Sequence, residues 1–138
     1  MTRAVAMRFT NLPGTRAGLA RAGSRLVVAD RPEGVAKGEG LGFNGAELLA
    51  ASLGGCFWND LHYAAEARGI ALGQVEVEAE VTLAGSPLRV VRARIHAQVV
   101  AGSPGHAREA FEAACLDSTI ANSLTAAFPI AFALEDSP

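Results

Sequence analysis

The sequence has little net charge, few cysteines and no long apolar run, and each shortage excludes a class of protein. A formal net charge of −2 argues against a protein that binds a nucleic-acid backbone or an anionic membrane surface. No uncharged apolar run reaches the roughly 18 residues that cross a bilayer. Residues 1–10 contain no apolar segment of the kind found in secretion signals, so we expect a cytoplasmic protein.

The cysteines number only two, Cys56 and Cys115. In the reducing cytoplasm a structural disulfide between them is not expected. They lack the C-x-x-C spacing of a zinc site, and the histidines His62, His96 and His106 are scattered along the chain. We therefore expect neither a bound metal nor another cofactor.

Apolar residues, by contrast, are abundant. They make up 50% of the sequence and charged residues 19%, a balance that fills a core and excludes intrinsic disorder. The length suits a single domain that spans residues 1–138. The order of its periodic segments, with strands on both sides of helices, predicts an α+β fold.

The N-terminal part of the chain is predicted as short strands and a loop. Residues 5–9 and 24–29 have the apolar content of strands, which we expect to pair as an antiparallel meander. The glycine-rich stretch 31–42 predicts a flexible loop. A helix follows over residues 44–68 and ends at Gly69.

Two alternating segments after this helix, residues 75–83 and 91–99, predict a β-hairpin with one apolar and one polar face. Pairing Val81 with Val91 places glutamates of the first strand opposite arginines of the second, which favours this register. The remaining predicted elements are, in chain order, a helix capped by Ser103, a short helix that starts at Asp117 or Ser118, and a strand over residues 128–134.

The helix over residues 44–68 is unusually apolar, with no charged residue from Leu48 to Trp58. A helix that is apolar nearly all round is buried. One small subunit offers too little surface to cover it, so we expect a partner surface. Gly54 and Gly55 in its middle cost about 1 kcal/mol each relative to alanine, which suggests the close approach of another helix or backbone.

Cys56 lies in the middle of this helix, where the simplest interpretation is a small buried apolar residue. Its neighbours on the same helix face, Asn59, Asp60 and Tyr63, are polar and indicate a site or a partner. A carboxylate at Asp60 would repel a thiolate, so a reactive Cys56 needs a cation from elsewhere in the fold. Cys115, near the end of its own helix, is a poor nucleophile but suits the role of a resolving thiol.

Glu47 has two interpretations. In a helix that starts after Asn44 it takes the third position, where the glutamate of a capping box accepts a hydrogen bond from the N-cap amide. Alternatively, it orients an arginine brought in from elsewhere. It cannot touch Cys56 itself, because nine residues of helix place it about 13.5 Å away along the axis and roughly half a turn around.

Three segments of the sequence resemble the OsmC/Ohr family: Asn44–Phe57, Glu66–Leu72 with the strand that follows, and Glu112–Ser118. The resemblance implies an intertwined homodimer in which two α+β subunits wrap antiparallel sheets around long, buried central helices. It also implies thiol-dependent reduction of organic hydroperoxides in defence against oxidative stress. Ohr-type members take electrons from lipoyl proteins, so the implied partners are a hydroperoxide and a thiol reductant.

By this resemblance, Cys56 is the peroxidatic residue and Cys115 the resolving residue. Peroxidatic members hold the thiolate with an arginine of the N-terminal region, for which Arg16 is the candidate and Arg21 and Arg25 are the alternatives. A guanidinium beside Cys56 would provide the cation that its own helix lacks.

The sequence departs from the family pattern at two positions. Organic-hydroperoxide enzymes carry Asn-Pro-Glu at the start of the helix, and this glutamate pairs with the arginine. Its position is Ala46 here, so Glu47, one residue later, is the glutamate available to orient Arg16. The proline usual after the second cysteine is Leu116. These departures place the sequence nearer to an OsmC-like branch than to Ohr, and a second hypothesis stays open: a non-catalytic protein that holds a small hydrophobic ligand in the dimer cleft near Cys56.

Overall fold

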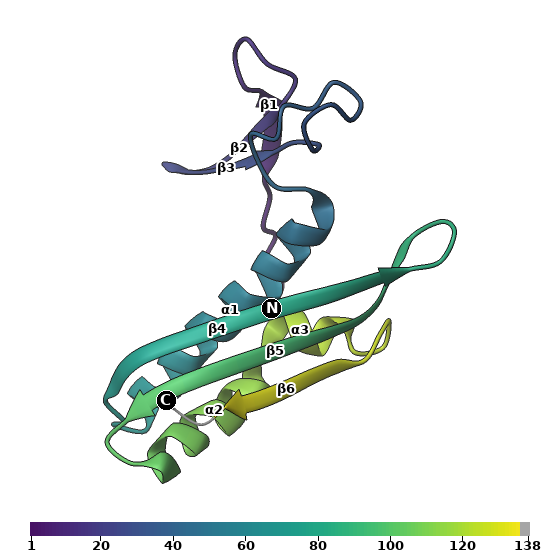
Figure 1. The fold of residues 1–138 in the computed structure, drawn as a ribbon. Coiled ribbons are helices and arrows are strands. Elements are labelled where there is room, and N and C mark those ends of the chain that lie inside the picture. Colours follow the sequence, from purple (N-terminus) through teal and green to yellow (C-terminus); the bar gives the residue numbers. More distant parts are fainter. Residues whose placement is uncertain (136–138) are drawn as a thin grey trace. The chain divides into compact units, whose positions relative to one another are not determined.

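The computed structural model describes residues 1–135 and confirms the predicted α+β composition. In chain order its elements are β1 (Arg8–Asn11), β2 (Gly18–Ala22), β3 (Arg25–Ala29), α1 (Gly45–Ala67), β4 (Leu72–Ala84), β5 (Arg89–Ala101), α2 (Pro104–Asp117), α3 (Thr119–Leu124) and β6 (Ile130–Glu135) (Figure 1). The chain divides into two compact units, Met1–Leu48 and Leu49–Pro138.

The first unit holds an antiparallel sheet in the order β1-β2-β3. The two predicted strands do not pair with each other as expected, because β2 lies between them, and β1 covers residues 8–11 rather than 5–9. The sequence pattern does not predict β2, because this strand begins at Gly18 and has Leu19 as its one large apolar residue. The tight turn from β2 to β3 contains Gly23 with a φ of 63°, a conformation that glycine adopts readily.

The loop between β3 and α1 is organised by the buried carboxylate of Asp30. Its Oδ2 accepts hydrogen bonds from the amides of Glu39 (3.1 Å) and Leu41 (3.0 Å), and its Oδ1 accepts one from the amide of Arg31 (2.8 Å). These hydrogen bonds, led by that of Leu41, hold the pKa of Asp30 below its ordinary value. The segment predicted as a flexible loop is indeed a loop, and its backbone is tied to this carboxylate at several points.

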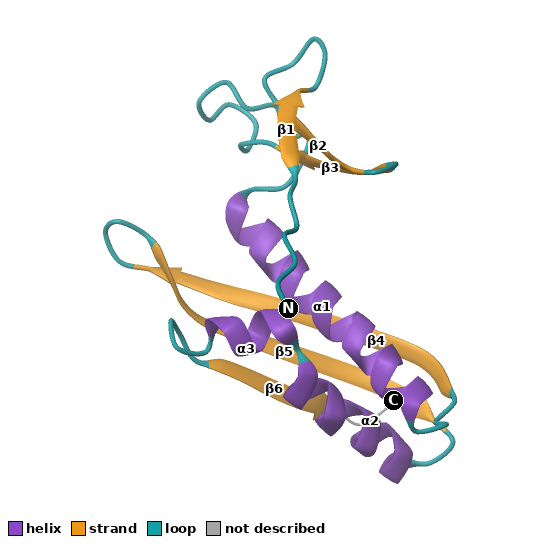
Figure 2. Cartoon of the chain, turned by 180° about the vertical axis from the view of Figure 1, so that it is seen from behind, coloured by secondary structure: helices purple, strands orange, loops and turns teal. Residues whose placement is uncertain are grey.

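The second unit is a three-stranded sheet with its helices packed on one face (Figure 2). β4 and β5 are antiparallel, whereas β6 runs parallel to β5, which corrects the prediction of antiparallel sheets alone. Between β5 and β6 the chain passes through α2 and α3, and such a helical crossover returns the next strand in the same direction.

The hairpin of β4 and β5 has the predicted faces but not the predicted register. Val81 pairs with Ala93 rather than with Val91, and Glu80 lies opposite Arg94. An irregularity in the pairing near the turn accounts for part of this shift, because it leaves an extra residue on β5. Since the shift amounts to two residues, the side chains of β5 from Ala93 to Val99 keep their predicted faces, whereas Val91, the residue skipped in the pairing, is exposed.

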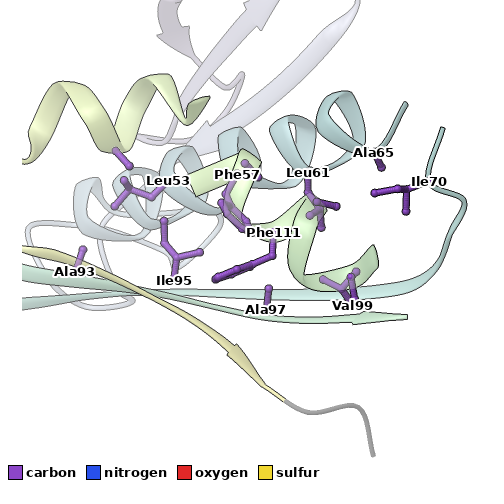
Figure 3. Packing of buried hydrophobic residues seen from close by; sticks show 14 residues of the cluster. Leu53, Phe57, Leu61, Ala65, Ile70, Ala93, Ile95, Ala97, Val99 and Phe111 are labelled. Carbon is purple, nitrogen blue, oxygen red and sulfur yellow. The ribbon is translucent and has the colours of Figure 1, made fainter. Parts of the chain in front are cut away.

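The core of the second unit is built around Phe57, which is fully buried on α1 (Figure 3). Its ring centroid lies 5.6 Å from that of Phe111 in α2 and 5.7 Å from that of Phe132 in β6. Leu53 and Leu61, one turn before and one turn after Phe57, are also fully buried. The apolar residues at i, i+4 spacing therefore form the stripe of α1 that faces the core.

Within the described residues only this stripe of α1 is buried, which agrees with the expectation that one subunit offers too little surface to cover the helix. On the other side, Trp58 is 41% exposed and Tyr63 is 71% exposed. The two glycines of α1 have different surroundings. A Cβ on Gly54 would lie 3.1 Å from the Cβ of Ala79 in β4, whereas a Cβ on Gly55 would meet nothing within 4 Å. The predicted close approach is present at Gly54 and absent at Gly55 within the described residues.

The predicted start of α2 is confirmed. The hydroxyl of Ser103 caps this helix by accepting a hydrogen bond from the amide of His106 at 3.1 Å, and Pro104 lies in the first turn. Ser118 is the N-cap residue of α3, and β6 starts at Ile130, two residues later than predicted. No helix in the described part of the chain is both long and apolar enough to cross a membrane.

Candidate functional site

Cys56 lies on α1 with its side chain half-buried and its thiol free. Its Sγ donates a hydrogen bond to Oδ2 of Asp60, 3.4 Å away. One turn of helix separates these two residues, which is why the sequence alone places them on one face. The other two predicted neighbours, Asn59 and Tyr63, are exposed to solvent.

The contact between Cys56 and Asp60 is a hydrogen bond from a thiol to a carboxylate. Loss of the thiol proton would leave two anions in contact across this distance. Among residues 1–135, no ion pair involves Asp60. Within the second unit, the described residues therefore place no ion-pair partner beside Asp60 for a thiolate at Cys56.

Cys115 lies on α2 as a second free thiol, half-buried against the core. Burial raises the pKa of its thiol to about 11, and the negative charge of Glu112 on the same helix adds to the effect. The thiol therefore stays protonated near neutral pH. The raised pKa agrees with the prediction of a poor nucleophile, and its main cause is burial rather than the helix end.

Glu47 closes the capping box predicted at the start of α1. Its Oε1 accepts a hydrogen bond from the amide of Asn44 at 3.0 Å, and its own amide donates to Oδ1 of Asn44 at 2.9 Å. This reciprocal pair accounts for both side chains at the helix N-terminus. No ion pair joins Glu47 to Arg16 in the part of the chain that the structure describes.

The candidate arginines lie in the first unit, as does Glu47, whereas both cysteines lie in the second unit. Arg16 precedes β2 and lines an open hollow of about 520 Å³ in the first unit. Arg21 belongs to β2, and Arg25 opens β3, where its Nε donates to the carbonyl oxygen of Ala22 at 3.1 Å. Of these three arginines, Arg16 alone lines the hollow.

Arg31 is a further cation on this hollow that no sequence pattern singles out. Its Nη2 lies 3.2 Å from Oδ1 of Asp30 and donates to the carbonyl oxygen of Arg16 at 2.7 Å. The second bond joins residues 15 positions apart, so local spacing could not reveal it. It ties the backbone at Arg16 to the loop that Asp30 organises.

The polar face of the second sheet holds a cluster around His96. Nδ1 of His96 lies 2.7 Å from Oε1 of Glu135, and Nε2 accepts a hydrogen bond from Nε of Arg94 at 2.9 Å. The hydrogen bond with His96 lowers the pKa of Glu135. Because Glu135 belongs to β6 and His96 to β5, the same bond links the two strands.

Within residues 1–135, no group of three or more His, Cys, Asp or Glu side chains is placed so that it could hold a metal ion.

Comparison with known proteins assigns this fold. The family model described as OsmC-like protein matches residues 38–133. A search of curated proteins finds no match. Among solved structures, the chain is similar to an OsmC-like protein from Mycoplasma pneumoniae, with 16% identity, a TM-score of 0.80 and 100% of each chain covered.

Two further similar structures are organic hydroperoxide resistance proteins by name. The first, from Legionella pneumophila, has 19% identity and a TM-score of 0.72, with 97% of this chain and 99% of that chain covered. The second, OhrB of Bacillus subtilis, has 20% identity and a TM-score of 0.67, with 95% and 98% covered. These likenesses show the fold, and the family model matches more than half of the sequence. The chain therefore belongs to the OsmC-like protein family.

Proposed function

We propose that the protein is a thiol-dependent peroxidase that reduces organic hydroperoxides in defence against oxidative stress. The observation that carries the proposal is the free, half-buried thiol of Cys56 on the central helix, together with a second free thiol at Cys115. The names of two similar structures, both organic hydroperoxide resistance proteins, support the choice of substrate.

In the proposed reaction, the sulfur of Cys56 attacks the terminal oxygen of the hydroperoxide. The O–O bond breaks, which leaves a sulfenic acid on Cys56 and releases an alcohol. The sulfur of Cys115 then attacks the sulfenic acid, which gives a disulfide and water. Because its pKa is raised to about 11, Cys115 does not compete for the peroxide in the first step. A thiol reductant, for which a lipoyl protein is the candidate, returns the disulfide to two thiols.

We further propose that the protein works in the cytoplasm as a homodimer, in which residues 1–138 form one OsmC-like domain. The support for the dimer is the face of α1 that the chain leaves open, with Trp58, Tyr63 and the free space beside Gly55. A second copy that packs on this face would complete the burial that the apolar sequence of α1 predicts. The proposed reaction needs no metal, other cofactor, nucleic acid or membrane.

Intact-mass measurement tests the peroxidase function directly. Reduced protein treated with one equivalent of cumene hydroperoxide should lose the mass of two hydrogen atoms, because Cys56 and Cys115 join in a disulfide. Subsequent addition of a thiol reductant should restore the original mass. An unchanged mass, with both thiols still open to alkylation, would contradict the peroxidase.

That contrary result would favour the alternative function, non-catalytic binding of a small hydrophobic ligand. A groove of about 370 Å³ in the second unit supports this alternative, since it is lined by small and apolar residues of α1 and β4. The lining residues are Ala50, Ala51, Gly54, Gly55, Trp58, Val77 and Ala79. Its volume lies at the lower end of the range for small-molecule sites, which starts at about 300 Å³.

We propose Arg16 as the cation that faces the Cys56 thiolate, with Glu47 to orient it. Arg16→Gln should slow oxidation of Cys56 by cumene hydroperoxide about tenfold or more, because the thiolate loses its counter-charge. Arg21→Gln, which removes the same charge from β2, is the matched control, and equal slowing by both variants would refute a specific role of Arg16.

Glu47→Gln in the same assay tests the proposed orientation of Arg16 by Glu47. Slower oxidation with a normal melting temperature supports this role, whereas an unchanged rate means that Glu47 only caps the helix.

A further inference from the structure

The hydrogen bond from Cys56 gives this thiol a proton acceptor on its own helix. Sγ lies 3.4 Å from Oδ2 of Asp60, and both side chains are half-buried. Within the described residues, Asp60 is the only carboxylate that is hydrogen-bonded to this sulfur. Glu47 has its Oε1 engaged by the amide of Asn44, and Ala46 carries no carboxylate. Within the second unit, the acid–base group in hydrogen-bond contact with the reacting atom is therefore Asp60.

We propose that Asp60 is the general base and general acid of the Cys56 reaction, a role that rests on the proposed peroxidase function. As the sulfur of Cys56 attacks the terminal oxygen of the hydroperoxide, the thiol proton passes to Oδ2 of Asp60. The O–O bond breaks, the terminal OH group stays on the sulfur as a sulfenic acid, and the electron pair leaves on the alkoxide. Asp60 then gives the proton to the alkoxide, which departs as an alcohol. Asp60 ends the step as a carboxylate, and no further reactant is consumed.

The leaving group explains why this proton matters. An alkoxide is a strong base, and its departure is easier when a proton reaches it as the O–O bond breaks. Transfer of the first proton is unfavourable on its own, because a free thiol is a weaker acid than a free aspartic acid by about five pK units. Formation of the S–O bond in the same step removes electron density from the sulfur and drives that transfer.

As an acid–base catalyst Asp60 speeds the reaction of Cys56 with hydroperoxide, whereas a purely electrostatic effect of its charge would slow that reaction. A negative charge beside Cys56 disfavours the thiolate, so on charge alone the removal of Asp60 would speed every reaction of the thiolate. Iodoacetamide measures this effect by itself, because iodide leaves without a proton. A hydroperoxide also needs the proton on its leaving oxygen, so the two reagents should respond differently to the loss of Asp60.

The experiment compares both reagents on Cys115→Ser protein near neutral pH, where Cys56 is the only thiol. Adding Asp60→Asn should slow oxidation by cumene hydroperoxide about tenfold or more, while alkylation by iodoacetamide is unchanged or faster. Asp60→Glu should restore much of the oxidation rate, because the carboxylate returns. Glu66→Gln removes an exposed carboxylate of the same helix, and this matched control should change neither rate.

The outcomes separate the role of Asp60 from the function on which it rests. If the Asp60→Asn protein is oxidised at the parent rate, Asp60 is not an acid–base catalyst. If both reagents slow by the same factor, Asp60 does not protonate the leaving oxygen and the proposed proton transfer to the alkoxide fails. If hydroperoxide does not oxidise even the Cys115→Ser parent protein, the peroxidase function itself fails and the role of Asp60 fails with it. Thermal melting of each variant shows whether it is folded. Should Asp60→Asn not fold, Asp60→Ala takes its place in both assays: slower oxidation without slower alkylation supports the proposal, and equal changes of both rates count against it.

Discussion

A Cys56→Ser variant is expected to show no change in mass when the reduced protein is treated with cumene hydroperoxide, whereas a Cys115→Ser variant should gain one oxygen atom and stop there. The serine hydroxyl is not nucleophilic enough to attack the peroxide, and the remaining Cys115 is held protonated. In the second variant the sulfenic acid forms on Cys56, but no second thiol captures it. Intact mass measures both outcomes, and a further mass gain on addition of dimedone, which reacts with sulfenic acids, identifies the added oxygen as a sulfenic acid.

Oxidation of the Cys56→Ser variant would move the peroxidatic role to Cys115 and contradict the proposed order of the two thiols. The raised pKa of about 11 argues against that result. Near neutral pH only about one in ten thousand Cys115 thiols would be ionised, against a few per cent for a free cysteine. Below its pKa, a thiol ionises about tenfold more for each pH unit, and the raised pKa of Cys115 extends this rise until the pH nears about 11. Alkylation of Cys115 in the same variant should follow this profile, and fast alkylation at neutral pH would show that its burial is incomplete.

The parts of the fold that follow from local pattern are those that the sequence predicts. The 3.6-residue period of α1, its end before Gly69 and the cap at Ser103 all depend on neighbours within one or two turns. The parts that fail depend on distant pairing. The order of β1, β2 and β3 and the parallel pairing of β6 are set by which strands meet in the folded chain. The predicted hairpin register is wrong by two residues, and one of these is an extra residue on β5 that an alternating pattern does not reveal.

The candidate site divides in the same way. The hydrogen bond between Cys56 and Asp60 spans one helical turn, and the capping box of Glu47 spans three residues, so both follow from helical spacing. The contact of Arg31 with the carbonyl of Arg16 crosses from one segment to another, so it requires the structure. The raised pKa of Cys115 is also tertiary in its main cause, because it depends on what packs around α2.

The second large effect concerns the open face of α1. Gly54 has a reason within the chain, since a Cβ there would lie only 3.1 Å from the Cβ of Ala79. Gly55 has no such reason within the described residues of the second unit, because a Cβ there would meet nothing within 4 Å. A glycine in a helix costs about 1 kcal/mol relative to alanine, so Gly55 calls for a contact from outside the chain. The exposed ring of Trp58, one turn away, indicates that this contact is apolar.

Gly55→Glu is therefore expected to turn the proposed dimer into a monomer and to weaken association about a hundredfold or more, because a carboxylate buried between two helices has no partner there. Sedimentation velocity at micromolar concentration measures the loss of the dimer. Wild-type protein that sediments as a stable monomer would contradict the proposed dimer. Gly55→Ala is the graded control. On a free surface it should stabilise the fold by about 1 kcal/mol at every protein concentration. In a close-packed dimer the same alanine should weaken association instead, so the two arrangements give effects of opposite sign.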